Sequence, residues 1–355
     1  MMLTYIFFYL TVFSLLWLNT KNTKNFFFGK IAFIMLFIMS ALRFDVGWDY
    51  GSYYNLIQKN IEFYDAQLGR LEPLNQLLIK ISQYFEFTQF YFITTSLIIC
   101  FYFYRTLKNY SSNFAVSSLL FLSLPIFFFS SLAIIRQFTA LAIVFYAFRY
   151  VESRQLFKFL ICLTIATLFH KSAIIAFPLF YLFLWKPHVS FFPIIYILGF
   201  FSSDLLYWLV ENLLPQYLKY LDKSIGEGGD KVLILFQLLG LFFLFFINRL
   251  KEQKNLNNFY FIAFFIGLFV WSSLAKYGHA GFRGGLYYIV FCLLLIPNII
   301  IEIKQNKLIL EITYAVCFFF FLLTLYLGNM NPKKDPNMPY QTFFFKDKFD
   351  LETSK

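Results

Sequence analysis

Charged residues are scarce in this sequence: only 14% of its 355 residues are Asp, Glu, Lys or Arg. Hydrophobic residues make up 60%, Phe alone contributes 54 residues, and the mean hydropathy is +0.65. A soluble domain of this size could not bury so much apolar surface, so the composition predicts a membrane protein. The net charge of +11 requires no nucleic-acid partner, because membrane proteins concentrate Lys and Arg in their inner loops.

Cysteine is also rare, and the four cysteines are isolated within apolar segments. The sequence contains no CxxC pair and no Cys/His cluster, which argues against a structural zinc site. We interpret the cysteines as small buried hydrophobic residues. The sequence therefore predicts no metal and no other cofactor.

Long apolar runs are what the sequence has in abundance. A membrane-spanning helix needs about 20 apolar residues, and the runs predict an all-α, polytopic transmembrane helical bundle of about 12 spans. The predicted spans are 3–18, 26–42, 88–106, 113–130, 132–149, 156–170, 172–185, 190–209, 232–248, 257–275, 284–301 and 308–327. The apolar stretch from 114 to 148 is too long for one crossing, and we expect it to fold back near Ser130 and Ser131.

Charge predicts the orientation of these spans. The first run has no basic residue before it and no small-residue cleavage site, so we expect a retained span with the N-terminus outside. The inner loops then hold 14 basic and 4 acidic residues, whereas the outer side holds 16 basic and 15 acidic residues. This difference favours a multi-pass membrane protein with both termini outside.

The sequence predicts one polytopic membrane domain, 1–329, followed by an outer-face tail, 330–355. Its outer loops lie at about 43–87 and 211–231. Within the first loop, 71–85 places leucines on one helical face, which predicts a short interfacial helix on the outer surface. The second loop is rich in glycine; we interpret it as a plain loop, with a lid as the alternative.

A polar segment, RFDVGWDYGSYY, follows the second predicted span. It contains Arg43, Asp45, Asp49, Tyr50 and Tyr53. A dense polar segment at the end of a membrane span is where a membrane enzyme would hold a polar substrate. The alternative is an ordinary loop whose glycines permit positive φ angles.

The predicted topology brings further polar residues to the outer face. Arg136 lies near the outer end of its span, His170 and Lys171 form an outer turn, and Arg283 lies at another outer helix end. Arginine binds phosphate well because its planar fork can reach two oxygens. An anionic group at the outer surface with a lipid tail fits a polyprenyl diphosphate. The alternatives are an Arg136 that extends to the membrane surface and a structural His170.

Several short motifs occur in order along the chain. They are the R-x-x-x-G-x-D-Y-x-x-Y that starts at Arg43, Glu72-Pro73, Pro125, Arg136-Gln137, the F-H-x-S-A from Phe169 to Ala173, Arg283 before Tyr287-Tyr288, and Pro339-Tyr340. In these motifs the chain resembles the EpsG family of exopolysaccharide membrane proteins, which is related to Wzy-type repeat-unit polymerases. The chain departs from the family at Trp48, where a small polar residue is more common.

The resemblance implies a glycosyltransferase-type polymerase that joins undecaprenyl-diphosphate-linked oligosaccharide repeat units into an exopolysaccharide, capsule or O-antigen chain. The active site would face the outside of the cytoplasmic membrane, and a flippase and a chain-length regulator are candidate partners besides the lipid bilayer. His170 or Asp49 would act as the catalytic base. The substrate-binding residues would be Arg43, Asp45, Tyr50, Tyr53, Arg136, Gln137, Lys171 and Arg283.

Three other functions remain open from the sequence. A lipid-linked oligosaccharide flippase or other transporter should carry polar residues at mid-membrane, whereas those of this chain gather at one predicted face. A metal-dependent polyprenyl-phosphate-sugar glycosyltransferase would use Asp45 and Asp49 as metal ligands. A membrane O-acyltransferase is a third alternative, which only His170 supports.

Overall fold

The computed structural model describes residues 2–21, 26–213, 229–253, 255–275, 279–303, 307–330 and 337–344. These residues are almost entirely helical, in agreement with the prediction of an all-α helical membrane protein. Much of the predicted second outer loop and of the C-terminal tail lies outside the described residues. The chain forms two compact units, and the prediction of one membrane domain over 1–329 stays a prediction.

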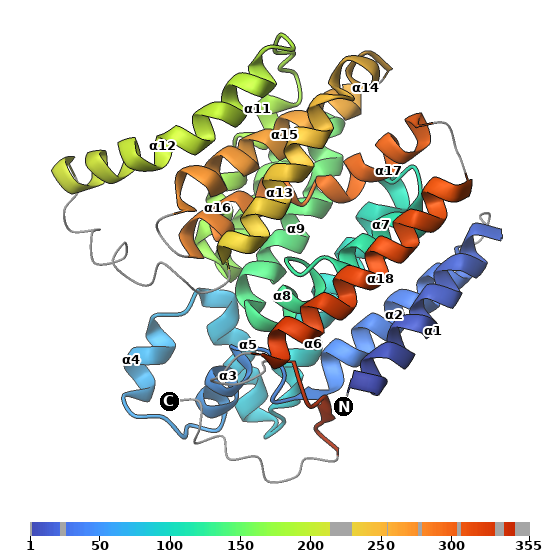
Figure 1. The fold of residues 1–355 in the computed structure, drawn as a ribbon. Helices are drawn as coiled ribbons and strands as arrows, with labels where there is room; N and C mark the ends of the chain where they lie inside the picture. The colour runs from blue at the N-terminus through green and yellow to red at the C-terminus, as the bar shows by residue number, and fades with distance from the viewer. Residues whose placement is uncertain are drawn as a thin grey trace. The chain divides into compact units, whose positions relative to one another are not determined.

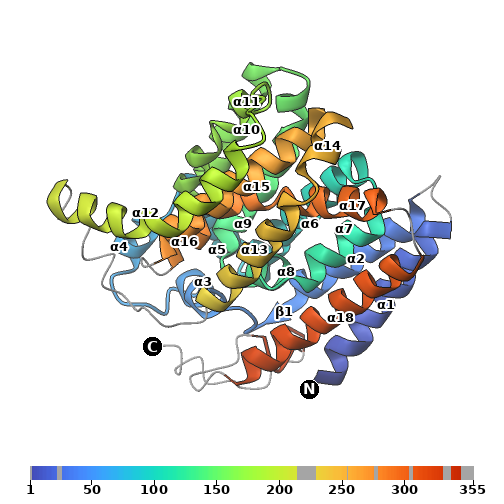
Figure 2. The ribbon, with the colours of Figure 1, turned by 45° about the horizontal axis from the view of Figure 1, so that its top comes forward.

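The first unit comprises Met1–Tyr146, Ile161–Lys171 and Gln305–Lys355. In this unit α1 packs against α2, α2 against α6, and α18 against α7 (Figures 1 and 2). The apolar helices are α1 (Met2–Lys21), α2 (Phe27–Leu42), α6 (Gln89–Tyr110), α7 (Phe114–Ser123), α8 (Phe128–Ala133), the start of α9 (Ile135–Glu152), the end of α10 (Leu156–Phe169) and α18 (Lys307–Asn329).

The long apolar stretch between 114 and 148 breaks at two places. One break is the turn at Pro125 between α7 and α8, and the other is at Ile134 between α8 and α9. The expectation of a fold-back at Ser130 and Ser131 is therefore wrong, because both serines lie inside α8. Proline lacks an N–H and restricts the residue before it, which explains the first break. The second break places Arg136 in the first turn of α9.

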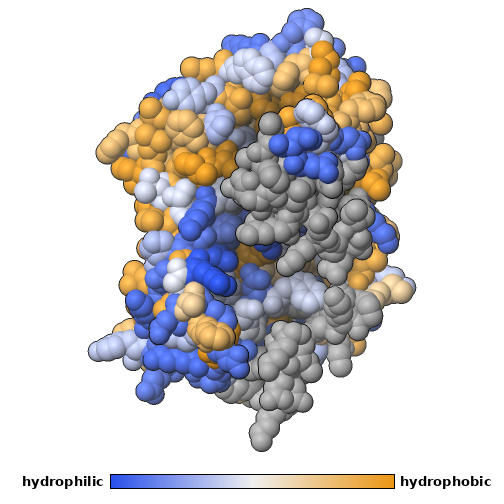
Figure 3. Space-filling view, turned by 90° about the vertical axis from the view of Figure 1, so that its left-hand side faces the viewer, coloured by the Kyte–Doolittle hydropathy of each residue, from blue (hydrophilic) through white to orange (hydrophobic). Residues whose placement is uncertain are grey.

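A polar cap of short elements completes the first unit. It consists of β1 (Arg43–Phe44), α3 (Tyr50–Ile57), α4 (Tyr64–Gly69), α5 (Pro73–Tyr84) and β2 (Gln341–Thr342). The strands pair antiparallel, with Arg43 opposite Thr342 and Phe44 opposite Gln341. Hydrophilic residues gather at the level of α3 and α4 on the face shown in Figure 3. This cap places the polar segment at Arg43 beside the C-terminal strand.

The helix predicted within 71–85 is present as α5. Pro73 occupies its first turn, where a missing N–H costs nothing. Its buried residues are Asn75, Ile79 and Ser82, whereas Leu77 is 51% exposed. The helix therefore packs through a mixed polar face and leaves apolar side chains exposed. Its position at the membrane interface stays a prediction.

The second unit comprises Ala147–Leu160 and Ser172–Lys304. Here α15 packs against both α12 and α16. Gly267 of α15 faces Gly285 of α16 so closely that a Cβ at either position would lie within 3.0 Å of the other's carbonyl oxygen. The elements are η1 (Lys171–Ala176, a 3₁₀ helix), α11 (Leu179–Leu182), α12 (Phe191–Leu213), α13 (Gly229–Leu244), α14 (Ile247–Gln253), α15 (Asn255–Ser273), α16 (His279–Ile289) and α17 (Cys292–Glu302).

Fewer helices meet the length and apolarity of a membrane span than the sequence predicts. Among the described residues, four do so: Met2–Lys21, Gln89–Tyr110, Leu256–Ser273 and Lys307–Asn329. A fifth is added if α16 and α17, which are bent by 56° at their junction, form one broken span. The continuous span predicted over 284–301 is thus a bent pair, and that over 172–185 is a 3₁₀ helix followed by a short α-helix.

Candidate functional site

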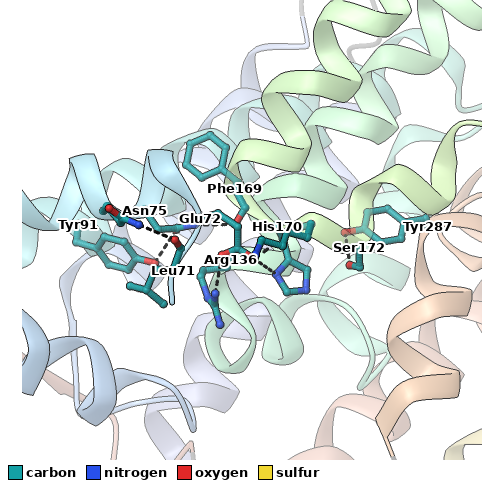
Figure 4. A network of polar contacts seen from close by, with 11 residues as sticks. Leu71, Glu72, Asn75, Tyr91, Arg136, Phe169, His170, Ser172 and Tyr287 are labelled. Carbon is teal, nitrogen blue, oxygen red and sulfur yellow. Dashed lines mark hydrogen bonds and ion pairs between the residues drawn. The ribbon is translucent and has the colours of Figure 1, made fainter. Parts of the chain in front are cut away.

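Glu72 stands at the centre of a polar cluster in the first unit. Its carboxylate is almost fully buried at the N-terminus of α5. Nη1 of Arg136 lies 2.6 Å from Oε2, and Nδ1 of His170 lies 3.2 Å from Oε1. The backbone N–H of Lys171 also donates to Oε1, at 3.3 Å. Figure 4 shows Glu72, Arg136 and His170 meeting from three separate segments of the chain.

Local chain geometry positions each member of the cluster. Arg136 follows the break that starts α9, and His170 directly follows the end of α10. Asn75 of α5 donates to the carbonyl oxygen of Phe169 at 2.6 Å, and the hydroxyl of Tyr91 donates to Asn75 Oδ1 at 3.1 Å (Figure 4). Hydrogen bonds thus tie α5 to the end of α10 and to α6, which holds Glu72 beside His170.

The polar segment contributes Tyr53 to the same cluster. Tyr53 lies close enough to Arg136 for the two groups to interact electrostatically, and its ring stacks on Tyr91 with centroids 4.9 Å apart. Burial raises the pKa of the Tyr53 phenol above its usual range, although the charge of Arg136 opposes this effect. Asp49 is near enough to act electrostatically on both tyrosines. The structure therefore brings Asp49 and Tyr53 near Arg136, and their roles in substrate binding and catalysis stay predictions.

The Glu72 carboxylate is ionised. Burial by itself would raise the pKa of Glu72, but the polar contact with His170 and the positive charge of Arg136 outweigh burial and lower this pKa to about 2. The cluster therefore places a fixed negative charge between a permanently charged arginine and a histidine.

Gly47 explains how the polar segment reaches Arg136. Its φ is +95°, and a Cβ at this position would lie 2.0 Å from the carbonyl oxygen of Leu132. Only glycine permits both this backbone conformation and this approach. The expectation of positive φ is confirmed at Gly47 but not at Gly51, which lies within α3. The contact joins the polar segment to the last turn of α8, just before Arg136.

Arg43 has a different environment. It is 1% exposed, and its Nε donates to the carbonyl oxygen of Val46 at 3.1 Å. Its Nη1 donates to the carbonyl oxygen of Ser40 and, at 3.3 Å, contacts Oγ of Ser96. The guanidinium also lies 5.3 Å from the centre of the Phe92 ring. These contacts connect β1 to α2 and α6, and the assignment of Arg43 to substrate binding stays a prediction.

Tyr50 also packs inside the first unit. Its ring stacks on Phe92 with centroids 4.2 Å apart, and its hydroxyl donates to Gln89 at 3.3 Å. Asp45 adopts a left-handed backbone, with φ of 52°, and is partly exposed. The roles of Tyr50 and Asp45 in substrate binding stay predictions.

The C-terminal strand explains the Pro339-Tyr340 motif. The Tyr340 hydroxyl donates to the carbonyl oxygen of Met39 at 2.9 Å. The N–H of Phe343 donates to the carbonyl oxygen of Leu42 at 3.0 Å. The motif thus lies against the end of α2 and the start of the polar segment. Two motifs at opposite ends of the sequence form one structure.

The remaining predicted residues lie in varied positions. Gln137 is buried beside Arg136, whereas the side chain of Lys171 is exposed. Arg283 belongs to the second unit, where it is exposed, and its convergence with Glu72 stays a prediction. Within that unit, Ser172 and Tyr287 share a hydrogen bond of 3.1 Å between their hydroxyls (Figure 4). The late tyrosine motif thus contacts the segment that follows His170.

Metal ligands do not gather in the part of the chain that the structure describes: no group of three or more His, Cys, Asp or Glu side chains could hold a metal ion. Asp45 and Asp49, the ligands that a metal-dependent transferase would need, therefore have no third such ligand beside them among those residues. In the Glu72 cluster, Arg136 can bind an anion and His170 can accept a proton.

Glu72 is absent from the site residues that the sequence predicts, although its pair with Pro73 is one of the family motifs. The signal was a carboxylate at the start of an otherwise apolar helix, which also fits an ordinary helix N-terminus. Its importance follows from partners 64 and 99 residues away in the chain, which no local pattern indicates.

Comparison with known proteins assigns a family to the part of the chain that contains the Glu72 cluster. No curated protein and no solved structure matches the chain. The sequence model of the EpsG family matches residues 26–342, a range that contains every residue of the Glu72 cluster and both strands. Since this range covers most of the chain, the protein belongs to the EpsG family.

Proposed function

We propose that this protein is a polymerase that joins undecaprenyl-diphosphate-linked oligosaccharide repeat units at the outer face of the cytoplasmic membrane. Membership of the EpsG family supports an exopolysaccharide-related polymerase in a general sense. The observation that carries the more specific proposal is the Arg136–Glu72–His170 cluster, which combines a partly exposed arginine with a partly exposed histidine at one ionised carboxylate. The product is an exopolysaccharide, capsule or O-antigen chain.

The reaction is a displacement at an anomeric carbon. A hydroxyl of the acceptor repeat unit attacks the anomeric carbon of the growing chain. The new bond joins this carbon to the acceptor oxygen, the bond to the diphosphate oxygen breaks, and its electron pair leaves with undecaprenyl diphosphate. The protein must stabilise the leaving negative charge and accept the hydroxyl proton.

The cluster has groups for both tasks. Arg136 is 27% exposed at its side chain and Lys171 is exposed, so both cations can reach a diphosphate. Arginine can hold two phosphate oxygens at once. His170 is 21% exposed at its side chain, and an imidazole nitrogen can accept a proton from a hydroxyl. Asp49, which acts electrostatically on Tyr53 beside Arg136, would orient the acceptor sugar. Arg283 would add a further cation.

The proposal includes a topology of about 12 spans with both termini outside. Labelling of single cysteines in intact cells by a membrane-impermeant thiol reagent tests this topology. Lys59 and Lys158 are both exposed. The cysteine of Lys59→Cys should react in intact cells, whereas the cysteine of Lys158→Cys should react only after lysis. The background can be low, because Cys100, Cys292 and Cys317 are buried and only Cys162 needs replacement by Ser. Labelling at position 158 alone would overturn the outer-face site.

Purified protein in lipid nanodiscs, supplied with synthetic undecaprenyl-diphosphate-linked repeat units, tests the activity. We expect a ladder of joined repeat units and release of undecaprenyl diphosphate, both in the presence of EDTA. Activity that EDTA abolishes and Mg²⁺ or Mn²⁺ restores would replace the proposal with a metal-dependent glycosyltransferase. Transfer of the lipid-linked unit across proteoliposomes without any joining would replace it with a transporter.

A further inference from the structure

We propose that Glu72 is a positioning residue that holds His170 in the tautomer able to accept the acceptor's proton at Nε2. The inference rests on the proposed function, in which His170 is the base. The two oxygens of the Glu72 carboxylate have different partners. Oε2 contacts Arg136 at 2.6 Å, whereas Oε1 contacts Nδ1 of His170 at 3.2 Å and accepts the N–H of Lys171.

The two edges of the imidazole differ in burial. Nδ1 is shielded from solvent and makes no hydrogen bond of ideal geometry, and the carboxylate oxygen Oε1 of Glu72 lies 3.2 Å from it. The side chain as a whole is 21% exposed. Figure 4 shows one ring nitrogen turned toward Glu72 and the other directed away from it. The exposed part of the side chain therefore excludes Nδ1, so Nε2 is the ring nitrogen that remains for a substrate hydroxyl.

The protonation state follows from the ionised carboxylate. A carboxylate can only accept hydrogen bonds, so a neutral imidazole beside it carries its hydrogen on Nδ1 and leaves a lone pair on Nε2. When Nε2 accepts the hydroxyl proton, the imidazolium is stabilised by the same carboxylate. A base oriented by a third group is a recurring arrangement in enzymes that activate hydroxyls.

Hydrogen bonds on both sides keep this geometry in place. Glu72 is fixed by the start of α5, and Asn75 of the same helix bonds the carbonyl oxygen of Phe169, the residue before His170. The carboxylate and the imidazole are therefore attached to a common frame. The charged and titratable groups that face this frame are Arg136 from α9, Lys171 from η1, Asp49 and Tyr53 from α3 and its N-terminus, and Tyr91 from α6.

The test measures the tautomer of His170 directly. Protein labelled with ¹⁵N-histidine in nanodiscs gives few signals, because the chain has only three histidines, and His170→Gln identifies the signal of interest. In the neutral form we expect ¹⁵N shifts of an Nδ1–H imidazole in the native protein. In Glu72→Met, which keeps the side-chain length but removes the acceptor, we expect a change to the Nε2–H form. In Glu72→Asp we expect partial return of the Nδ1–H form.

Matched variants separate the effect of the carboxylate from general damage. Arg136→Gln removes the other partner of Glu72 and should leave the His170 tautomer unchanged. Glu62→Gln removes an exposed carboxylate of the same polar cap and should change neither the tautomer nor the polymerisation rate. The rate of joining should fall by about 10²-fold in Glu72→Met, in the range expected for loss of general-base catalysis, and recover in part in Glu72→Asp.

The outcomes distinguish the inference from the function on which it rests. An Nε2–H signal in the native protein, or an unchanged tautomer in a folded Glu72→Met, would overturn the inference even if polymer forms. The native measurement alone decides the matter if Glu72→Met fails to fold. An Nδ1–H signal that depends on Glu72, in a native protein that joins no repeat units, would support the positioning of His170 and overturn the polymerase.

Discussion

Two arginines of the first unit, Arg43 and Arg136, follow helix ends or breaks in apolar sequence, yet their environments differ. The side chain of Arg136 is 27% exposed and pairs with an ionised glutamate, whereas Arg43 is 1% exposed and contacts carbonyl oxygens, hydroxyls and an aromatic ring. A buried arginine with neutral partners connects elements of the fold, whereas a partly exposed one beside a carboxylate can exchange partners with a ligand. Arginine in a membrane chain therefore has two uses that sequence alone does not separate.

The largest effect should come from Arg136→Lys. Lysine keeps the charge but cannot hold Glu72 and a phosphate with one planar group. We expect the joining rate to fall by about 10²-fold or more, as for loss of a group that stabilises transition-state charge, with single repeat units accumulating. Gel analysis of lipid-linked products measures this loss. The control is Arg105→Lys, which changes an exposed arginine near the end of α6 and should make chains of normal length. Chains of normal length in Arg136→Lys would show that Arg136 does not bind the substrate.

Gly47→Ala should lower the stability of the first unit more than Arg43→Lys or Tyr340→Phe does. The methyl group would meet the Leu132 carbonyl, and alanine would be forced to a φ of +95°. Strained backbone of this kind costs roughly 1–3 kcal/mol before any clash is counted. We expect a lower melting temperature and little polymer. Gly69→Ala, where a Cβ meets nothing within 4 Å, should melt like the native protein; equal melting of both glycine variants would contradict the close approach.

Arg43→Lys sharpens the comparison directly. Loss of the buried hydrogen bonds to Val46 and the serines should destabilise the protein by roughly 1–3 kcal/mol. If Arg43 only connects elements, the joining rate per folded molecule should remain close to native. Measurement of both melting and rate on the same preparation decides this. A rate as low as that of Arg136→Lys in a fully folded protein would assign Arg43 to the substrate instead.

Acid should weaken the Glu72 cluster within a defined pH range. The pKa of Glu72 is lowered to about 2 in the folded protein, against an ordinary value of about 4.3 for glutamate. Its stabilising contribution is therefore fully present above about pH 4.3 and disappears as the pH falls to about 2. The difference in melting temperature between the native protein and Glu72→Met should shrink as the pH falls from about 4.3 to about 2. A constant difference down to pH 2 would contradict an ionised Glu72.

Tyr340→Phe should have the smallest effect. It removes one hydrogen bond, from the C-terminal segment to Met39, and should cost roughly 0.5–1.5 kcal/mol. Tyr84→Phe is the control, because Tyr84 is 82% exposed. Proteolysis that removes the C-terminal segment more quickly from Tyr340→Phe than from Tyr84→Phe would confirm that this segment is tied to the start of the polar segment.

Helix positions were the part of the fold that the sequence could predict. The runs 26–42 and 88–106 agree with α2 and α6 within a few residues, because helix formation depends on local hydrogen bonds and on apolar side chains that need no particular partner. Predictions failed where one residue alters the chain direction, as at Pro125 and at the bend between α16 and α17. Such breaks depend on packing as well as on local preference.

By itself, the sequence determined that this is a helical membrane protein of the EpsG family whose polar residues belong to a few short motifs. Only the tertiary structure decided that Glu72 joins Arg136 to His170 and that Arg43 is buried. The physical reason is that hydrophobicity acts on each segment separately, whereas an ion pair forms only when folding brings two charges within about 4 Å. The chain distance between Glu72 and Arg136, 64 residues, hides that contact from any local pattern.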